Sequence, residues 1–372
     1  MNDIMQQFQI DAAMFGQFSG IYYIGYSLMH LPIGIALDRY GPRKIMTGCA
    51  LLTVAGLTPL LFANHWMYPI GGRLLIGIGS SAAILGVFKI IRMTFKEERF
   101  PRMLSLSVTI GLIGAIYGGG PVNYLCTSFG SQTVVSLFAI MGIALACITY
   151  WIVPNTTTSS QTAVLSDVKE VLRNPKVIWA CLFTGLMVGP LEGFADVWGT
   201  SFLKQVYGFD GTLAASLPSM IFIGMCFGGP LLNFIAEKIK NYLVTIIGAG
   251  IAMMGGFILL MSSSLAPSTI SLGFAVVGIC SAYQILAIYK ASTYVREQVV
   301  GLTTAMANMI IMIFGYMFHT MIGGIVHVMG GPTSPQALLS GIIVIPVGLC
   351  LGSIGFTFLL IHEKSRKKVE VI

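Results

Sequence analysis

The sequence predicts an all-α protein of the membrane, in which eleven helices form two bundles. Of its 372 residues 55% are hydrophobic and 9% are charged, and the mean hydropathy is +0.84. This composition is too apolar for a soluble domain. The apolar runs are long and continuous, which indicates helices rather than the alternating strands of a barrel. Lys and Arg gather in short loops on one side of these runs, so the net charge of +7 reflects membrane orientation rather than nucleic-acid binding.

The apolar runs divide into a group of five and a group of six. Each is close to the length of about 20 residues that crosses a bilayer. A short polar stretch, Met1 to Asp11, precedes them and is expected to be a loop without a signal peptide. The first five cover residues 12–37, 45–63, 68–92, 103–126 and 134–153. The other six cover residues 178–202, 212–236, 242–262, 268–292, 302–328 and 337–361.

A polar segment separates the two groups and predicts the domain boundaries. Residues 154–176 are rich in Thr and Ser and then become charged, as expected of a linker. The predicted organisation is therefore an N-terminal bundle over 1–153, a cytoplasmic linker over 154–176, and a C-terminal bundle with a short basic tail over 177–372.

A charged turn lies between the first two apolar runs. It has the spacing Gly-xxx-Asp-Arg-x-Gly-x-Arg-Lys, made by Gly34, Asp38, Arg39, Gly41, Arg43 and Lys44. This motif resembles the signature loop between the second and third helices of the major facilitator superfamily of secondary transporters. In the third run Arg73-xxx-Gly77-x-Gly79 resembles the Arg motif of that family's fourth helix. The resemblance implies two bundles around a central cavity, transport by alternating access, and a gating role for the charged turn.

The second half repeats the first, weakly. When Glu237 is aligned with Asp38, Lys238 coincides with Arg39 and Gly224 with Gly25, so this stretch reads as a decayed copy of the charged turn. Within the family's six-helix half, the alignment leaves the chain without the first helix. Two explanations are open: the sequence starts at an internal methionine, which we favour, or the protein lacks this helix.

The loop charges predict orientation. Basic residues concentrate on the side that carries the charged turn, the linker and the C-terminal tail, whereas the other side has almost only Lys204. By the positive-inside rule that basic side is cytoplasmic, and the N-terminus of the sequence is external. Short loops and the lack of an external glycosylation site favour a bacterial inner membrane.

Ionisable side chains inside the runs are the candidates for a transport pathway, because burying them is costly. Arg73 lies in the outer part of its run and Lys89 near the inner end; a structural bond is the alternative for Arg73, and snorkelling to the interface for Lys89. Glu192 and Asp196 are four residues apart and share a helix face. Glu192 is nearer the midplane, so we expect it to carry a coupling proton; the alternative is a rim exposed to water.

The resemblance extends this pathway to a further helix that lines the cavity. It places Tyr283, Gln284 and Tyr289 there. The lone histidines His30, His319 and His327 are more typical of packing residues than of proton carriers.

A Gly-Pro motif occupies the fourth run and has two interpretations. Gly118, Gly119, Gly120 and Pro121 resemble a motif of the family's drug antiporters, but Tyr124 and Leu125 replace its second pair of glycines. Packing of a kinked helix is the alternative.

These residues predict a secondary active transporter for a small polar or zwitterionic solute, such as an amino acid or short peptide. Basic groups in one half and acids in the other suit such a solute, and the coupling ion is expected to be H⁺. The alternatives are a drug or metabolite efflux antiporter, and a sensor or accessory protein that moves no solute. We expect a monomer in the lipid bilayer with no cofactor and no enzymatic activity. The seven cysteines are scattered singly, so no metal site or disulfide is expected.

Overall fold

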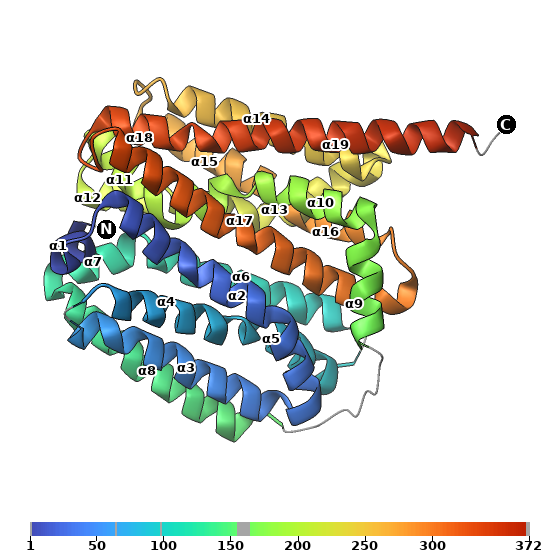
Figure 1. Cartoon of the computed structure of the whole chain (residues 1–372), viewed down its shortest axis with the longest axis horizontal. Coiled ribbons are helices and arrows are strands. Elements are labelled where there is room, and N and C mark those ends of the chain that lie inside the picture. Colours follow the sequence, from blue (N-terminus) through green and yellow to red (C-terminus); the bar gives the residue numbers. More distant parts are fainter. Residues whose placement is uncertain (1, 64, 97–98, 155–163, 370–372) are drawn as a thin grey trace. The chain divides into compact units, whose positions relative to one another are not determined.

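Every regular element is helical in the part of the chain that the computed structural model describes, which comprises residues 2–63, 65–96, 99–154 and 164–369. The chain divides into two units, Met1–Thr162 and Ala163–Ile372, which follow one another along the colour bar of Figure 1. Ten helices within the described ranges are long and apolar enough to cross a membrane, four in the first unit and six in the second. The predicted all-α membrane architecture is confirmed, and ten of the eleven predicted runs lie in these long helices.

The first unit begins with a short helix. Its described elements are α1 Asn2–Phe8, α2 Ala12–Tyr40, α3 Pro42–Phe62, α4 Met67–Ser80, α5 Ala82–Thr94, α6 Phe100–Gly118, α7 Gly120–Phe129 and α8 Ser131–Ile152. The prediction of a loop before Asp11 is wrong, because the Met and Gln side chains of α1 are good helix formers. Asp11 then starts α2 as its N-cap, since its carboxylate accepts a hydrogen bond from the amide of Met14 at 2.8 Å.

The predicted run over 103–126 is broken in two. Helix α6 ends at Gly118, and α7 begins at Gly120 with Pro121 in its first turn. Proline suits that position because it lacks an amide hydrogen to donate. Among the described residues, nothing lies within 4 Å of a Cβ placed on Gly118, so close packing does not explain this glycine. The Gly-Pro motif therefore coincides with a break between two helices.

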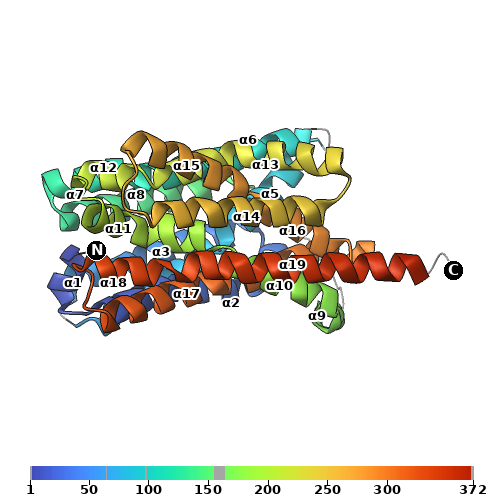
Figure 2. The same cartoon turned by 90° about the horizontal axis from the view of Figure 1, so that it is seen from above.

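The second unit is built around one well-buried crossing. Its elements are α9 Val164–Arg173, α10 Pro175–Leu186, the π-helix η2 Gly189–Trp198, α11 Gly199–Val206, α12 Gly211–Ser216, α13 Ser219–Ile239, α14 Tyr242–Leu260, α15 Pro267–Ser281, α16 Tyr283–Ser292, the 3₁₀ turn η3 Glu297–Val299, α17 Val300–Val328, α18 Pro335–Ile342 and α19 Val344–Val369. Helices α10, η2 and α11 form the crossing, in which Phe194 packs edge-on against Phe202, Phe257 and Phe274. Figure 2 shows α19 running along α14, with which it packs.

The predicted linker is helical in its described part. Residues 155–163 lie outside the described ranges, and α9 occupies most of the remainder. Arg296, just before η3, holds this helix, because its guanidinium lies 2.8 Å from the carboxylates of both Asp167 and Glu170. Helix α9 thus belongs to the second unit by its contacts.

A glycine crossing occurs in both units. Gly25 of α2 faces the carbonyl oxygen of Leu74 in α4, and a Cβ on Gly77 would lie 2.1 Å from the carbonyl oxygen of Tyr22. In the second unit Gly224 of α13 faces the carbonyl oxygen of Ala275 in α15, and Gly278 faces that of Ile221. Small residues let two helix backbones approach closely in a membrane. The sequence alignment pairs Gly25 with Gly224, so the internal repeat is visible in the packing.

Candidate functional site

The charged turn is anchored to α5 through Lys89. Asp38 lies in the last turn of α2, and the Lys89 ammonium is 2.7 Å from its Oδ1. The same ammonium donates to the carbonyl oxygen of Leu37 at 2.8 Å. A cation at a helix C-terminus also interacts favourably with the exposed carbonyl groups there. Lys89 thus bonds to the end of α2, a role that neither the pathway nor the snorkelling interpretation included.

The rest of the turn is fixed by backbone geometry and by α8. Gly41 has φ +85°, a conformation that favours glycine, and α3 begins at the next residue, Pro42. Arg43 donates from Nε to the carbonyl oxygen of Val153 at 2.7 Å. Arg39 lies over the ring of its neighbour Tyr40, at 5.4 Å from the centroid. The turn is therefore a defined structure and does not only supply positive charge.

Two positions of the motif make little contact. Lys44 is exposed, and a Cβ on Gly34 would meet only the side chain of Leu85, at 3.7 Å, among the described residues.

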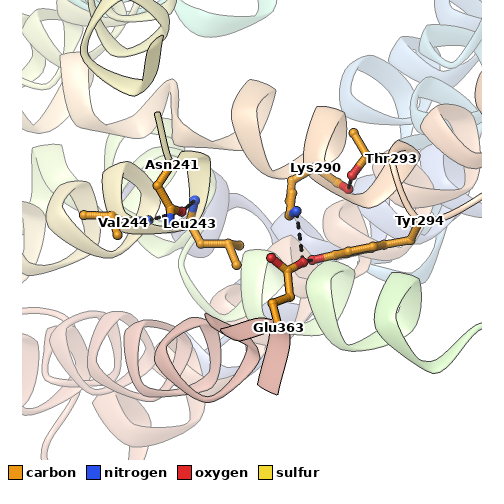
Figure 3. A network of polar contacts seen from close by, with 7 residues as sticks. All are labelled: Asn241, Leu243, Val244, Lys290, Thr293, Tyr294 and Glu363. Atoms are coloured by element: carbon orange, nitrogen blue, oxygen red, sulfur yellow. Dashed lines mark hydrogen bonds and ion pairs between the residues drawn. The ribbon is translucent and has the colours of Figure 1, made fainter. Parts of the chain in front are cut away.

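The decayed copy keeps the turn but not the ion pair. Lys240 has φ +56° at the position that corresponds to Gly41, and Asn241 caps α14 by accepting from the amides of Leu243 and Val244 (Figure 3). Glu237 and Lys238 are exposed, and neither has an ion-pair partner among the described residues. The sequence could not reveal the retained turn, because lysine is not a residue that marks positive φ.

A polar network takes the place of that pair in the second unit (Figure 3). Glu363 of α19 accepts from the Lys290 ammonium at 2.9 Å and from the Tyr294 hydroxyl at 2.5 Å. Asn174, before α10, donates to the carbonyl oxygen of Tyr294 at 2.8 Å. Burial, and then the hydrogen bond from its hydroxyl to the Glu363 carboxylate, raise the pKa of Tyr294. The network joins the ends of α10, α16 and α19, and no motif in the sequence marks it.

Arg73 of α4 is a cation within a candidate membrane span of the first unit. Its guanidinium carbon lies 5.5 Å from the ring centroid of Phe18 and 5.7 Å from that of Tyr22, both on α2. The buried Nε has no hydrogen-bond partner in the described part of the chain, and no carboxylate there forms an ion pair with Arg73. Two aromatic faces therefore hold the guanidinium and leave its donors available.

Two acids of the second unit, Glu192 and Asp196, lie on the π-helix η2. Glu192 is partly buried, and the side chain of Asp196 is 43% exposed. The imidazole of His319, on α17, is fully buried with its Nε2 3.7 Å from Oδ2 of Asp196. The sequence predicts only a packing role for His319, because 123 residues separate it from Asp196 and no local pattern connects them.

The predicted residues of α16 divide into two places. Tyr283 is fully buried, donates to the carbonyl oxygen of Thr184 at 2.8 Å, and lies within electrostatic range of Glu192. Gln284 is buried beside it, and its Nε2 has no hydrogen-bond partner among the described residues. Tyr289 instead packs against Tyr242 and is 51% exposed. Tyr283 and Gln284 are thus placed with the interior of the unit, and Tyr289 is not.

The remaining histidines differ in burial. His30 is buried with its ring 5.2 Å from that of Tyr26, whereas His327 is exposed. Among the described residues, no group of three or more His, Cys, Asp or Glu side chains could hold a metal ion.

Comparisons with known proteins agree with this architecture. The chain is 27% identical to the multidrug resistance protein MdtL of Klebsiella pneumoniae over 287 residues, which cover 68% of this chain and 72% of MdtL. It is 24% identical to the uncharacterized transporter YybO of Bacillus subtilis over 396 residues, covering 96% of this chain and 87% of YybO. The putative metabolite transport protein NicT of Pseudomonas putida is 26% identical over 164 residues, or 41% of this chain and 36% of NicT.

Solved structures show the same fold. The nucleoside transporter NupG superposes with a TM-score of 0.78 at 13% identity, over 95% of this chain and 92% of NupG. A bacterial homolog of the human lysosomal transporter Spinster, in an inward-facing occupied conformation, superposes with a TM-score of 0.68 at 16% identity. The superposition covers 96% of this chain and 90% of the homolog. A family model described as the Major Facilitator Superfamily matches residues 1–317. The predicted family is therefore confirmed: this chain is an integral membrane protein that belongs to the Major Facilitator Superfamily of transporters.

Proposed function

We propose that this transporter moves a small zwitterionic solute, an amino acid or a short peptide, by alternating access coupled to protons. The observation that carries the proposal is the guanidinium of Arg73, which lies in a membrane span without an acid partner among the described residues. An intramembrane cation without compensation is costly. A solute carboxylate would supply that compensation through paired hydrogen bonds, which suit the planar guanidinium.

Two acids of the second unit would serve the coupling ion. Glu192 and Asp196 are the carboxylates of its π-helix, and Tyr283 and Gln284 lie in the same unit. A carboxylate whose surroundings alternate between water and protein can change its affinity for a proton during the cycle. Glu192 is the better shielded of the two, which supports a role for it in coupling.

Efflux of drugs or metabolites is the second candidate function. It is favoured by the similarity to MdtL and NicT, whose names describe multidrug resistance and metabolite transport. In an efflux carrier for apolar cations, a pathway arginine without an acid partner would weaken binding of the drug, because like charges repel. Arg73 therefore favours the zwitterion over a cationic drug.

The test is uptake into proteoliposomes of amino acids, short peptides, sugars and cationic drugs, with and without an inward proton gradient. We expect accumulation of one amino acid or peptide class that depends on the gradient. Arg73→Gln should lower the apparent affinity about 10- to 100-fold, because a hydrogen bond to a charged group contributes about 1.5–3 kcal/mol.

Arg173→Gln is the matched control, because this arginine is exposed on α9. It should behave as the parent does. Export of a cationic drug that Arg73→Gln leaves unchanged would contradict the proposal and favour the efflux function.

A further inference from the structure

Asp196 and His319 form a contact between a half-exposed acid and a buried base. The Asp196 side chain is 43% exposed and the His319 side chain 0%, with 3.7 Å between Oδ2 and Nε2. That distance lies within ion-pair range but exceeds a hydrogen bond. Acids within membrane spans almost always face a bundle interior or a water-filled cavity. The exposed side of Asp196 is therefore its access to water, while His319 lies behind it inside the unit.

Close packing of η2, which carries Asp196, against α17, which carries His319, produces this contact. A Cβ on Gly189 of η2 would lie 2.8 Å from the ring of Phe318, and a Cβ on Gly193 would lie 3.3 Å from Cβ of that residue. These glycines let α17 approach η2 at the residue that precedes His319. The backbone of η2 is π-helical, and the amide of Gly199 donates to the carbonyl oxygen of Phe194, five residues earlier. Such segments are rare and occur frequently at functional sites.

The elements that pack against α17 carry few other ionisable groups near His319. On η2 these are Glu192 and Asp196, and on α16 Tyr283 bonds to a backbone carbonyl. Helix α18 has none. The acids and bases of α9, η3 and the far end of α19 lie at the other end of α17, near the network of Glu363. The remaining groups are Lys176 and Cys181 on α10, Tyr289 and Lys290 on α16, Cys350 on α19, and Tyr316 and His327 on α17 itself.

We propose that Asp196 and His319 form a proton-exchange pair, in which Asp196 takes up a proton from water and His319 stores it. In the loading step the carboxyl O–H bond of Asp196 breaks and its proton binds the lone pair of Nε2. The products are a carboxylate and an imidazolium, which attract each other, and release follows the reverse path. The transfer requires the two atoms to approach by less than 1 Å from their 3.7 Å separation. Rotation of the exposed Asp196 side chain can supply that approach.

This inference rests on the proposed proton coupling and assigns the proton to a defined place within it. Histidine suits the storage role, because its imidazole serves as a proton shuttle in proteins.

Two readouts test the pair. The first is proteoliposome transport by Asp196→Asn, His319→Gln and, as a control on the same helix, the exposed His327→Gln. Asp196→Asn and His319→Gln should lose accumulation driven by a pH gradient but retain solute counterflow, and the pH dependence of their counterflow should flatten. His327→Gln should match the parent in both assays. Gradient-driven accumulation by Asp196→Asn equal to that of the parent would overturn the inference.

The second readout does not depend on transport. In purified protein with ¹⁵N-labelled histidine, the NMR titration of His319 should shift on Asp196→Asn, whereas that of His327 should not. No shift for His319 would also overturn the inference. Because Asp196 is half-exposed, this variant should fold even if His319→Gln does not. A parent without any counterflow would instead refute the proposed function and leave the titration as a separate test of the pair.

Discussion

Lys89 and Lys290 occupy equivalent positions in the two units but bind different acids. When α15 and α16 are laid on α4 and α5 so that Gly278 coincides with Gly77, Lys290 coincides with Lys89. Lys89 binds Asp38 at the end of α2, whereas Lys290 binds Glu363 on α19. The repeat has thus retained the lysine and changed its partner, which leaves Glu237 exposed.

The Asp38–Lys89 pair yields the prediction at this scale. The Asp38 side chain is 59% exposed, so the pair should contribute less than about 1 kcal/mol to stability. Asp38→Asn should therefore leave expression and the melting temperature unchanged while lowering the uptake rate severalfold, because the predicted gate loses its charge. The test measures the uptake rate and the melting temperature of three variants: Asp38→Asn, Lys89→Gln and the double variant.

The double variant is the internal control. If the ion pair is the relevant contact, removing both charges should be no worse than removing Asp38 alone. Unchanged uptake by Asp38→Asn would leave the loop with only its predicted role in orientation.

Side chains could be predicted from the sequence only where a short motif marks them. The charged turn and Arg73 were identified because their spacing is local. The contact between Asp196 and His319 depends on how η2 and α17 pack, and a single sequence carries no signal for that. Tyr294 and Glu363 were missed for the same reason, since their contact joins segments 69 residues apart.

At the scale of elements, the close crossings between helices determine which glycines can be replaced. Gly71 and Gly77 lie on the same helix, α4, but only Gly77 meets a backbone: its Cβ would be 2.1 Å from the carbonyl oxygen of Tyr22, and nothing described lies within 4 Å of a Cβ on Gly71. A backbone atom cannot move aside as the end of a side chain can.

The two glycines should therefore respond oppositely to alanine. Gly71→Ala should be neutral or stabilising by up to about 1 kcal/mol, because alanine is the better helix former. Gly77→Ala should destabilise by about 1–3 kcal/mol, because overpacking outweighs that gain. Thermal unfolding in detergent measures both. Gly278→Ala and Gly273→Ala form a similar pair in the second unit, because a Cβ on Gly278 would meet the carbonyl oxygen of Ile221, whereas nothing described lies within 4 Å of a Cβ on Gly273. Equal melting temperatures for Gly71→Ala and Gly77→Ala would contradict the close crossing.

The lengths of most elements followed from apolar runs, but their interruptions did not. Residues 178–202 read as one run and are divided among α10, η2 and α11, because hydropathy does not distinguish an α-helix from a π-helix. The division of residues 103–126 at Gly119 escaped prediction as a full break, although the Gly-Pro motif indicated a kink.

At the scale of the whole molecule, the number of crossings decides on which sides the chain ends lie. Ten long helices alone would place both ends on the same side, whereas a crossing by α6 and α7 together makes eleven. These two helices have 19 and 10 residues, which at about 1.5 Å per residue exceed the roughly 30 Å hydrocarbon core. The loop before α6, which carries Lys96 and Arg99, and the basic linker after α8 should share a side under the positive-inside rule. Together, α6 and α7 should therefore complete one crossing.

Reporter fusions test that crossing. A phosphatase that is active only outside the cytoplasm should be active after Phe129, in the turn between α7 and α8, and inactive after Lys368. A fluorescent protein that folds only in the cytoplasm should give the reverse pattern, and a tag before Asn2 should be accessible from outside. The matched control is a fusion after Phe95, in the basic loop, which should behave as the fusion after Lys368 does. If the fusions after Phe129 and Phe95 report the same side, α6 and α7 do not cross and both ends of the chain share one side of the membrane.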